Sequence, residues 1–156
     1  MQITTYILAS IVSYLGLLLG VILIKLAPEE QNPGKKYFIF LKKILLFLII
    51  LFILFFYSIE IIPSLILLLI AMFLLFNGKF RFIKFLEKYY LDYTILGFIF
   101  FCSSKIVNLF VIESVLIFLY GIPVASLIFK IKKKNYIDIF KNASFFVPII
   151  LLYLLL

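Results

Sequence analysis

Long apolar runs alternate with short basic segments along this chain, and the lengths of the runs predict membrane-spanning helices. The first run, residues 3–26, has 24 residues and ends at Ala27-Pro28, where proline breaks the helix. The second run, residues 44–76, would be about 50 Å long as one helix, whereas a hydrocarbon core is about 30 Å thick. We therefore predict a hairpin in this run, with its turn within residues 57–63.

The apolar sequence from 93 to 129 lies between two basic clusters and therefore predicts an even number of crossings. Two short spans fit it, with a turn either near Ser103 to Asn108 or at Glu113-Ser114. A last span starts between Tyr136 and Ala143, and only its longer version, about 21 residues, reaches about 30 Å. The six predicted spans are approximately residues 3–26, 44–58, 61–77, 93–111, 112–129 and 137–156.

Composition indicates that lipid rather than water surrounds this chain. Of its 156 residues 67% are hydrophobic, with a mean hydropathy of +1.31, so polar surface is too scarce to cover a water-soluble core. The apolar runs are continuous rather than alternating, which favours helices over a closed barrel. The sequence predicts one all-α domain, residues 1–156, folded as a polytopic membrane bundle of about six helices with short connecting loops.

The basic residues predict how the bundle is oriented. Fourteen of the fifteen Lys and Arg residues lie in three clusters, 25–43, 79–88 and 130–141. Six spans would put these clusters on one side, which the positive-inside rule makes cytoplasmic, and both termini on the outer side. Topology and anionic lipid headgroups on the cytoplasmic side account for the net charge of +8, so nucleic-acid binding is not predicted.

Residues 79–92 show a different pattern, which is typical of a basic helix lying in the membrane interface. The charged residues share one helical face, and aromatic residues lie away from its centre. The alternative is a cytoplasmic extension of the fourth span. The residues on the charged face are Arg81, Lys84, Lys88 and Asp92.

Tyrosines support the predicted span ends. Eight of the ten lie near those ends, as expected for an aromatic belt in a chain without Trp. Tyr14 and Tyr120 do not fit this belt.

Small residues form a narrow stripe on the first predicted span. They lie within about 60° of one another on a helix and allow another backbone to approach closely, either inside the chain or in a second subunit. The stripe consists of Ala9, Ser13, Gly16 and Gly20. Ser114, Gly121 and Ala125 form a comparable stripe, and we expect the two helices to pack together.

Lys105, Asn108 and Glu113, together with two serines, form a polar group inside an otherwise apolar region. Ionisable groups within membrane spans are costly and usually functional. On one continuous helix, Lys105 and Glu113 would lie about 12 Å apart along the axis, too far to pair. Two interpretations stay open, an outer hairpin tip with interfacial side chains and an intramembrane polar site.

The connection after the first span, residues 27–37, is the richest polar segment. Pro33-Gly34 predicts a type II turn that would bring Lys35 and Lys36 back toward Glu29 and Glu30. The functional interpretation is a loop that binds headgroups or a partner protein. The simpler alternative is a hairpin connector whose charges neutralise one another.

Chemistry is sparse in this sequence. It has one cysteine, Cys102, and no histidine, so an internal disulfide and a zinc site lack their ligands, and no catalytic residue, metal or cofactor is predicted. We expect an interaction or assembly subunit of a membrane complex, with a membrane protein or a second copy as partner. The alternatives are a small solute or lipid transporter using Lys105, Asn108 and Glu113, and a lipid-modifying enzyme using the first loop.

Overall fold

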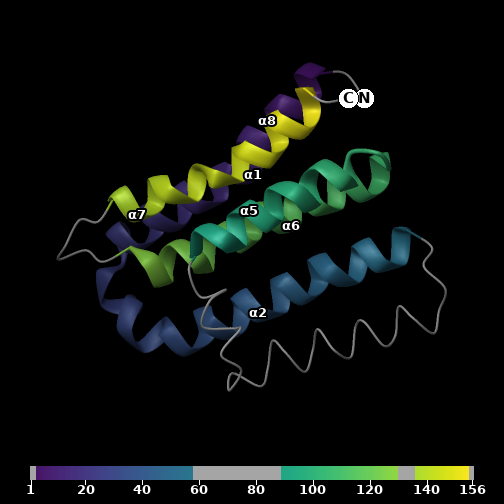
Figure 1. The fold of residues 1–156 in the computed structure, drawn as a ribbon. Helices are drawn as coiled ribbons and strands as arrows, with labels where there is room; N and C mark the ends of the chain where they lie inside the picture. Colours follow the sequence, from purple (N-terminus) through teal and green to yellow (C-terminus); the bar gives the residue numbers. More distant parts are fainter. Residues whose placement is uncertain (1–2, 58–88, 130–135, 155–156) are drawn as a thin grey trace.

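The computed structural model describes residues 3–57, 89–129 and 136–154, and every element in these ranges is helical (Figure 1). This confirms the all-α class. The α-helices are α1 (Ile3–Leu26), α2 (Gln31–Phe56), α5 (Tyr89–Ser103), α6 (Val107–Ile128), α7 (Tyr136–Phe140) and α8 (Phe146–Leu154). Two short 3₁₀ helices, η1 (Pro28–Glu30) and η2 (Lys141–Phe145), connect neighbouring elements.

Three helical segments are long and apolar enough to cross a membrane. They are Ile3–Leu26, Pro28–Phe56 and Val107–Ile128, while Asp92–Ser103 and Lys141–Leu151 are shorter apolar helices. The predicted span 61–77 and most of the predicted interfacial helix 79–92 lie outside the described residues.

Contacts between residues show how the helices run. Tyr6 stacks on Phe110, and the Ser13 hydroxyl donates a hydrogen bond to the Ser114 carbonyl, so α1 and α6 are parallel. Asp92 contacts Tyr120 on α6, whereas Phe100, further along α5, packs on Phe110. Helix α5 is therefore antiparallel to α6.

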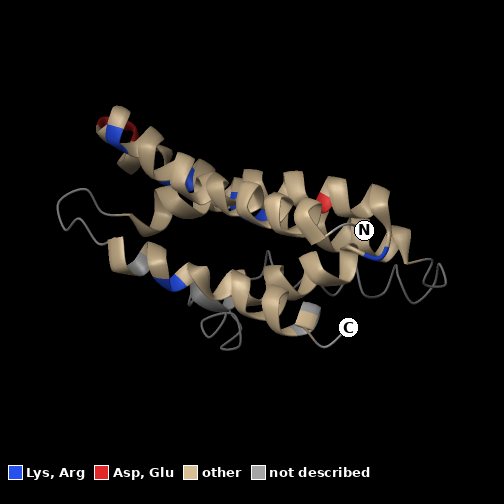
Figure 2. Cartoon of the chain, turned by 90° about the horizontal axis from the view of Figure 1, so that it is seen from above, with Lys and Arg blue, Asp and Glu red and all other residues tan. Residues whose placement is uncertain are grey.

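Helix α2 is also antiparallel to α6. The Gln31 side chain at its start reaches the end of α6, and the Tyr57 hydroxyl just after it donates to the Cys102 carbonyl near the end of α5. The described helix ends nearest the three basic clusters therefore lie at one end of the bundle. Figure 2 shows the charged residues gathered mainly toward the end away from the N and C labels.

The first connection differs from the prediction. Instead of a type II turn at Pro33-Gly34, η1 leads directly into α2, which begins at Gln31 and continues to Phe56. Proline is tolerated here because amides in the first turn of a helix have no intrahelical acceptor. The helix therefore starts well before residue 44, where the second predicted span begins.

The turn of the α5–α6 hairpin lies at the earlier of the two predicted positions. Residues 104–106 connect the helices, and their amides donate to the carbonyls of residues 101–103. The Ser103 and Ser104 hydroxyls also donate to carbonyls of the last turn of α5. Helix α6 then continues without a break through Glu113-Ser114, where the alternative placed the turn, and through Pro123. The predicted division between spans 93–111 and 112–129 is therefore wrong, because α5 already ends at Ser103.

The last apolar segment is divided by η2 into α7 and α8, so it is not one continuous helix. It packs on α5 at Gly97, where an added Cβ would collide with the carbonyl of Phe145 and lie 2.7 Å from Pro148 Cγ. The Tyr14 hydroxyl donates to the Ile139 carbonyl at 3.2 Å. These contacts join α7, η2 and α8 to α1 and α5.

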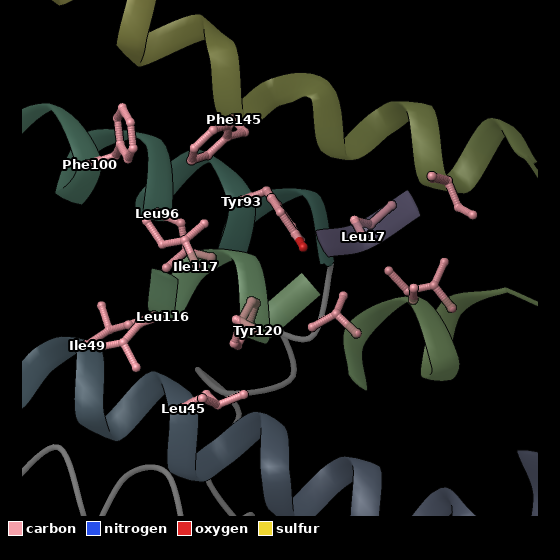
Figure 3. Close-up of a cluster of buried hydrophobic side chains, with 14 of the residues drawn as sticks. Leu17, Leu45, Ile49, Tyr93, Leu96, Phe100, Leu116, Ile117, Tyr120 and Phe145 are labelled. Carbon is pink, nitrogen blue, oxygen red and sulfur yellow. The ribbon is translucent and has the colours of Figure 1, made fainter. Parts of the chain in front are cut away.

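The core of the bundle is strongly aromatic. Tyr93 packs on Tyr14, Tyr120 and Phe145, and Phe145 also contacts Phe100, with ring centroids 5.6–6.3 Å apart. Figure 3 shows Phe145 above Tyr93, with the aliphatic residues of α5 and α6 below and beside them and those of α2 at the bottom of the cluster. Large rings from four elements thus fill the interior between the helices.

Candidate functional site: buried ionisable groups around α6

Helices α1 and α6 approach closely through their small residues. A Cβ added to Gly20 would lie 2.6 Å from both Ala125 Cβ and the Ile122 carbonyl oxygen, and one added to Gly16 would collide with the Phe118 carbonyl. Ser13 is buried at the same contact, while Ala9 is only partly buried. Gly16 and Gly20 therefore make an internal contact of this chain.

The structure separates the three residues of the predicted polar site. Lys105 lies exposed on the hairpin turn, and Asn108 is exposed in the first turn of α6. Glu113 lies further along α6, and its side chain is fully buried. The three side chains therefore form no common site.

Glu113 is the most unusual of these groups. Both of its carboxylate oxygens are buried, and neither has a hydrogen-bond partner among the residues that the structure describes. Glu113 lies about 9 Å from the start of α6 and about 22 Å from its end along the axis. It therefore lies well inside the apolar length of this helix.

A second ionisable site connects α2, α5 and α6. Lys42 Nζ donates to Asp92 Oδ2 at 2.6 Å, and the Tyr120 hydroxyl donates to the same oxygen at 3.0 Å. Asp92 is only 7% exposed and Lys42 is 18% exposed. Two donors from different helices thus stabilise one nearly buried carboxylate, and Lys42 Nζ also lies 6.0 Å from the Tyr120 ring centroid.

The two sites are related through the geometry of α6. Glu113 and Tyr120 are seven residues apart, so they point within about 20° of each other and lie about 10 Å apart along the axis. Leu116 and Ile117 occupy the helical turn between them, packed among side chains of α2 and α5 (Figure 3). The buried Tyr93 hydroxyl, beside Tyr120, is likewise without a hydrogen-bond partner in the described residues.

The four charged residues singled out in the first connection are exposed. Glu29 and Glu30 lie on η1, whereas Lys35 and Lys36 lie on α2. Within the described part of the chain, neither glutamate pairs with either lysine. The turn that would bring these charges together is replaced by helix, and they form no ion pair in the described residues.

Sequence reasoning missed the Lys42–Asp92–Tyr120 site. Lys42 was one of a basic cluster, and Asp92 was placed on the charged face of the interfacial helix. Asp92 is instead inside the bundle, paired with Lys42. Tyr120 and Tyr14 do not fit the predicted aromatic belt, and the structure places both at the interior cluster. The belt prediction is wrong for Tyr6 and Tyr93, which are also buried among the helices.

Among the described residues, no group of three or more His, Cys, Asp or Glu side chains is placed to hold a metal ion. Comparison with protein-family models, curated proteins and solved structures finds no match for this chain. The class that the described residues define is an all-α protein with three helices long and apolar enough to cross a membrane, as in an integral membrane protein.

Proposed function

We propose that this chain is a multi-pass membrane protein that carries a proton or a small cation through its helix bundle, with Glu113 as the internal binding group. The observation that carries the proposal is the burial of Glu113 without a partner for either carboxylate oxygen in the described residues. A buried polar group without a partner calls for a specific explanation, such as an ion or a functional role. In a membrane span, an ionisable residue is by default a functional group.

The free-energy cost of burying the Glu113 carboxylate supports binding of a proton or a small cation. An ionised carboxylate costs several kcal/mol to bury without a partner, and a bound cation or proton removes much of that cost. An apolar side chain of similar size at position 113 would avoid the cost altogether. The presence of a glutamate is therefore explained by what it binds rather than by stability.

The Lys42–Asp92–Tyr120 site supplies a second carboxylate near the same side of α6. Asp92 lies against Tyr120, about 10 Å from Glu113 along α6 in the direction of the basic end. Lys42 occupies this carboxylate with a charge-assisted hydrogen bond. A proton or cation moving from Glu113 toward the basic end would have to compete with the Lys42 ammonium for the Asp92 carboxylate.

The proposed orientation follows from the charge pattern. The described helix ends next to the basic clusters lie at one end of the bundle, which supports placing the basic loops in the cytoplasm and both termini outside. Thiol labelling of Lys36→Cys and Lys105→Cys in a Cys102→Ser background, with an impermeant reagent on intact cells, tests this orientation. The two thiols should report opposite sides of the membrane, and labelling from the same side would contradict it.

Transport is tested with the purified full-length protein in liposomes. Influx of protons, Na⁺ and K⁺ is followed with entrapped ion-sensitive dyes under an imposed membrane potential. We expect one of these fluxes to exceed that of empty liposomes and to fall at least tenfold in Glu113→Gln, which keeps the shape of the side chain and removes its charge. Glu30→Gln makes the same chemical change at an exposed position and should leave the flux unchanged.

Two results would overturn the transport proposal. One is the absence of flux above empty liposomes for all three ions. The other is a flux that Glu113→Gln and Glu30→Gln reduce equally. Circular dichroism and gel filtration of each variant show whether a lost flux reflects a lost fold.

The assembly role predicted from the sequence stays a prediction. The residues expected to carry a subunit contact, Gly16 and Gly20, are used against α6 inside the chain. Native mass spectrometry of the protein purified in mild detergent tests this role. A monomer with no co-purifying protein would count against it.

A further inference from the structure

The first three turns of α2 lie beside the basic end of α6. The Gln31 amide donates to the Ser126 and Phe129 carbonyls at the end of α6, whereas Lys42, eleven residues later, reaches Asp92 beside Tyr120. Tyr120 is about 12 Å from the end of α6 along its axis. Residues 31–42 therefore lie beside the last two or three turns of α6, at the basic end of the bundle. At this depth a spanning helix passes from the hydrocarbon core into the headgroup region.

This segment presents amines and rings together on its surface. Lys35 and Lys36 are exposed, Tyr37 is 76% exposed and Phe40 is 56% exposed. Lys36 and Phe40 are four residues apart and therefore share one side of the helix. The opposite side faces the bundle, because Gln31, Lys42 and Leu45 make their contacts or are buried there.

The exposed residues fit one kind of surface. Lysine stems lie along apolar surface while their ammonium groups reach polar headgroups, and aromatic rings prefer this same depth. Ile39 and Leu41 in the same turns are exposed as well, so the surface continues the lipid-facing surface of the bundle. A soluble acidic protein would match the lysines but would leave these apolar side chains without a suitable contact.

We infer that the first three turns of α2 bind anionic phospholipid headgroups, with Lys36 contacting the phosphate and Phe40, on the same side of the helix, packing against the glycerol and upper acyl region. Lys35 lies nearer the side of Lys42 and contributes through its exposed positive charge. This site is independent of the proposed transport through Glu113. The net charge of +8 favours an anionic over a zwitterionic headgroup. Glu29 and Glu30 form no ion pair with the two lysines in the described structure, and residues 25–43 keep an excess of basic over acidic side chains.

The test uses purified full-length protein in detergent micelles and a fluorescent phosphatidylglycerol, with the matching phosphatidylcholine as the neutral lipid. We expect the anionic lipid to bind more tightly and the double variant Lys35→Gln/Lys36→Gln to weaken it roughly thirtyfold, from about 1 kcal/mol per lysine. Affinity should also fall as salt is raised. Lys105→Gln removes one exposed lysine at the other end of the bundle and should leave the affinity unchanged.

Phe40→Ala keeps both lysines and tests the ring contact separately, with a smaller but measurable loss expected. The inference is overturned if phosphatidylcholine binds as tightly as phosphatidylglycerol. It is also overturned if Lys105→Gln weakens binding as much as the double variant does.

Discussion

The close contact between α1 and α6 predicts that a single added methyl group at Gly20 separates the two helices. An alanine Cβ there would lie 2.6 Å from the Ile122 carbonyl oxygen and from Ala125 Cβ. Ordinary van der Waals contact begins near 3.4 Å, so relief requires a movement of about 0.8 Å. Both obstacles are rigid, because one is backbone and the other is the first atom of a side chain.

The magnitude follows from how quickly dispersion weakens with distance. A gap of 0.5–1 Å loses about a quarter to a half of the attraction between facing atoms, and overpacking in a close-packed interior typically costs about 1–3 kcal/mol. Alanine also favours the helix over glycine by up to about 1 kcal/mol. We expect Gly20→Ala to lower the free energy of unfolding by about 1–2 kcal/mol, or the melting temperature by about 2–8 °C.

Thermal unfolding of the purified protein in detergent, followed by circular dichroism, measures this change. Gly34→Ala is the matched control, because its Cβ would meet only the tip of the Phe38 ring at 2.9 Å, which can rotate away. The double variant Gly20→Ala/Ala125→Gly removes one of the two obstacles and should recover part of the loss. The reasoning is refuted if Gly20→Ala is as stable as the unmodified protein or if Gly34→Ala is equally destabilised.

Three further changes are predicted. Lys42→Ala leaves Asp92 buried with one donor fewer and should cost about 3 kcal/mol, whereas Lys42→Met with Asp92→Leu should recover most of it in the same unfolding assay. Gln31→Ala removes the side-chain donor to two carbonyls at the end of α6 and should lower the free energy of unfolding by about 1–2 kcal/mol. Glu113→Met should raise the melting temperature while abolishing transport, because it replaces a buried acid that has no partner among the described residues with an apolar side chain. A lowered melting temperature would assign Glu113 a structural role.

Much of the fold could be predicted from the pattern of apolar and charged residues. The first predicted span coincides with α1, Ile3–Leu26, because a long apolar run followed by Ala27-Pro28 leaves little choice of boundary. The α5–α6 turn could be narrowed only to two positions, since serines and a lysine at 103–105 compete as turn residues with Glu113-Ser114. Packing decided between them, because α6 runs continuously past Glu113 and buries it about two turns from the start of the helix.

The prediction for the first connection was wrong for a local reason. Pro33-Gly34 favours a type II turn in an isolated peptide, but proline is equally compatible with the first turn of a helix. The Gln31 side chain, by bonding to the end of α6, holds the start of α2 at that point. A contact between residues 95 positions apart therefore overrides a local preference.

The sequence alone determined that this chain forms apolar helices suited to a membrane and which residues share each helical face, because length, hydropathy and periodicity are local properties. Only the tertiary structure decided which face meets which neighbour. Lys42, Asp92 and Tyr120 come from three separate helices, and their pairing depends on how far each helix is shifted along the others. The sequence already shows Glu113 as an acid in an apolar run. That neither of its carboxylate oxygens has a partner among the described residues becomes visible only when the neighbouring helices are in place.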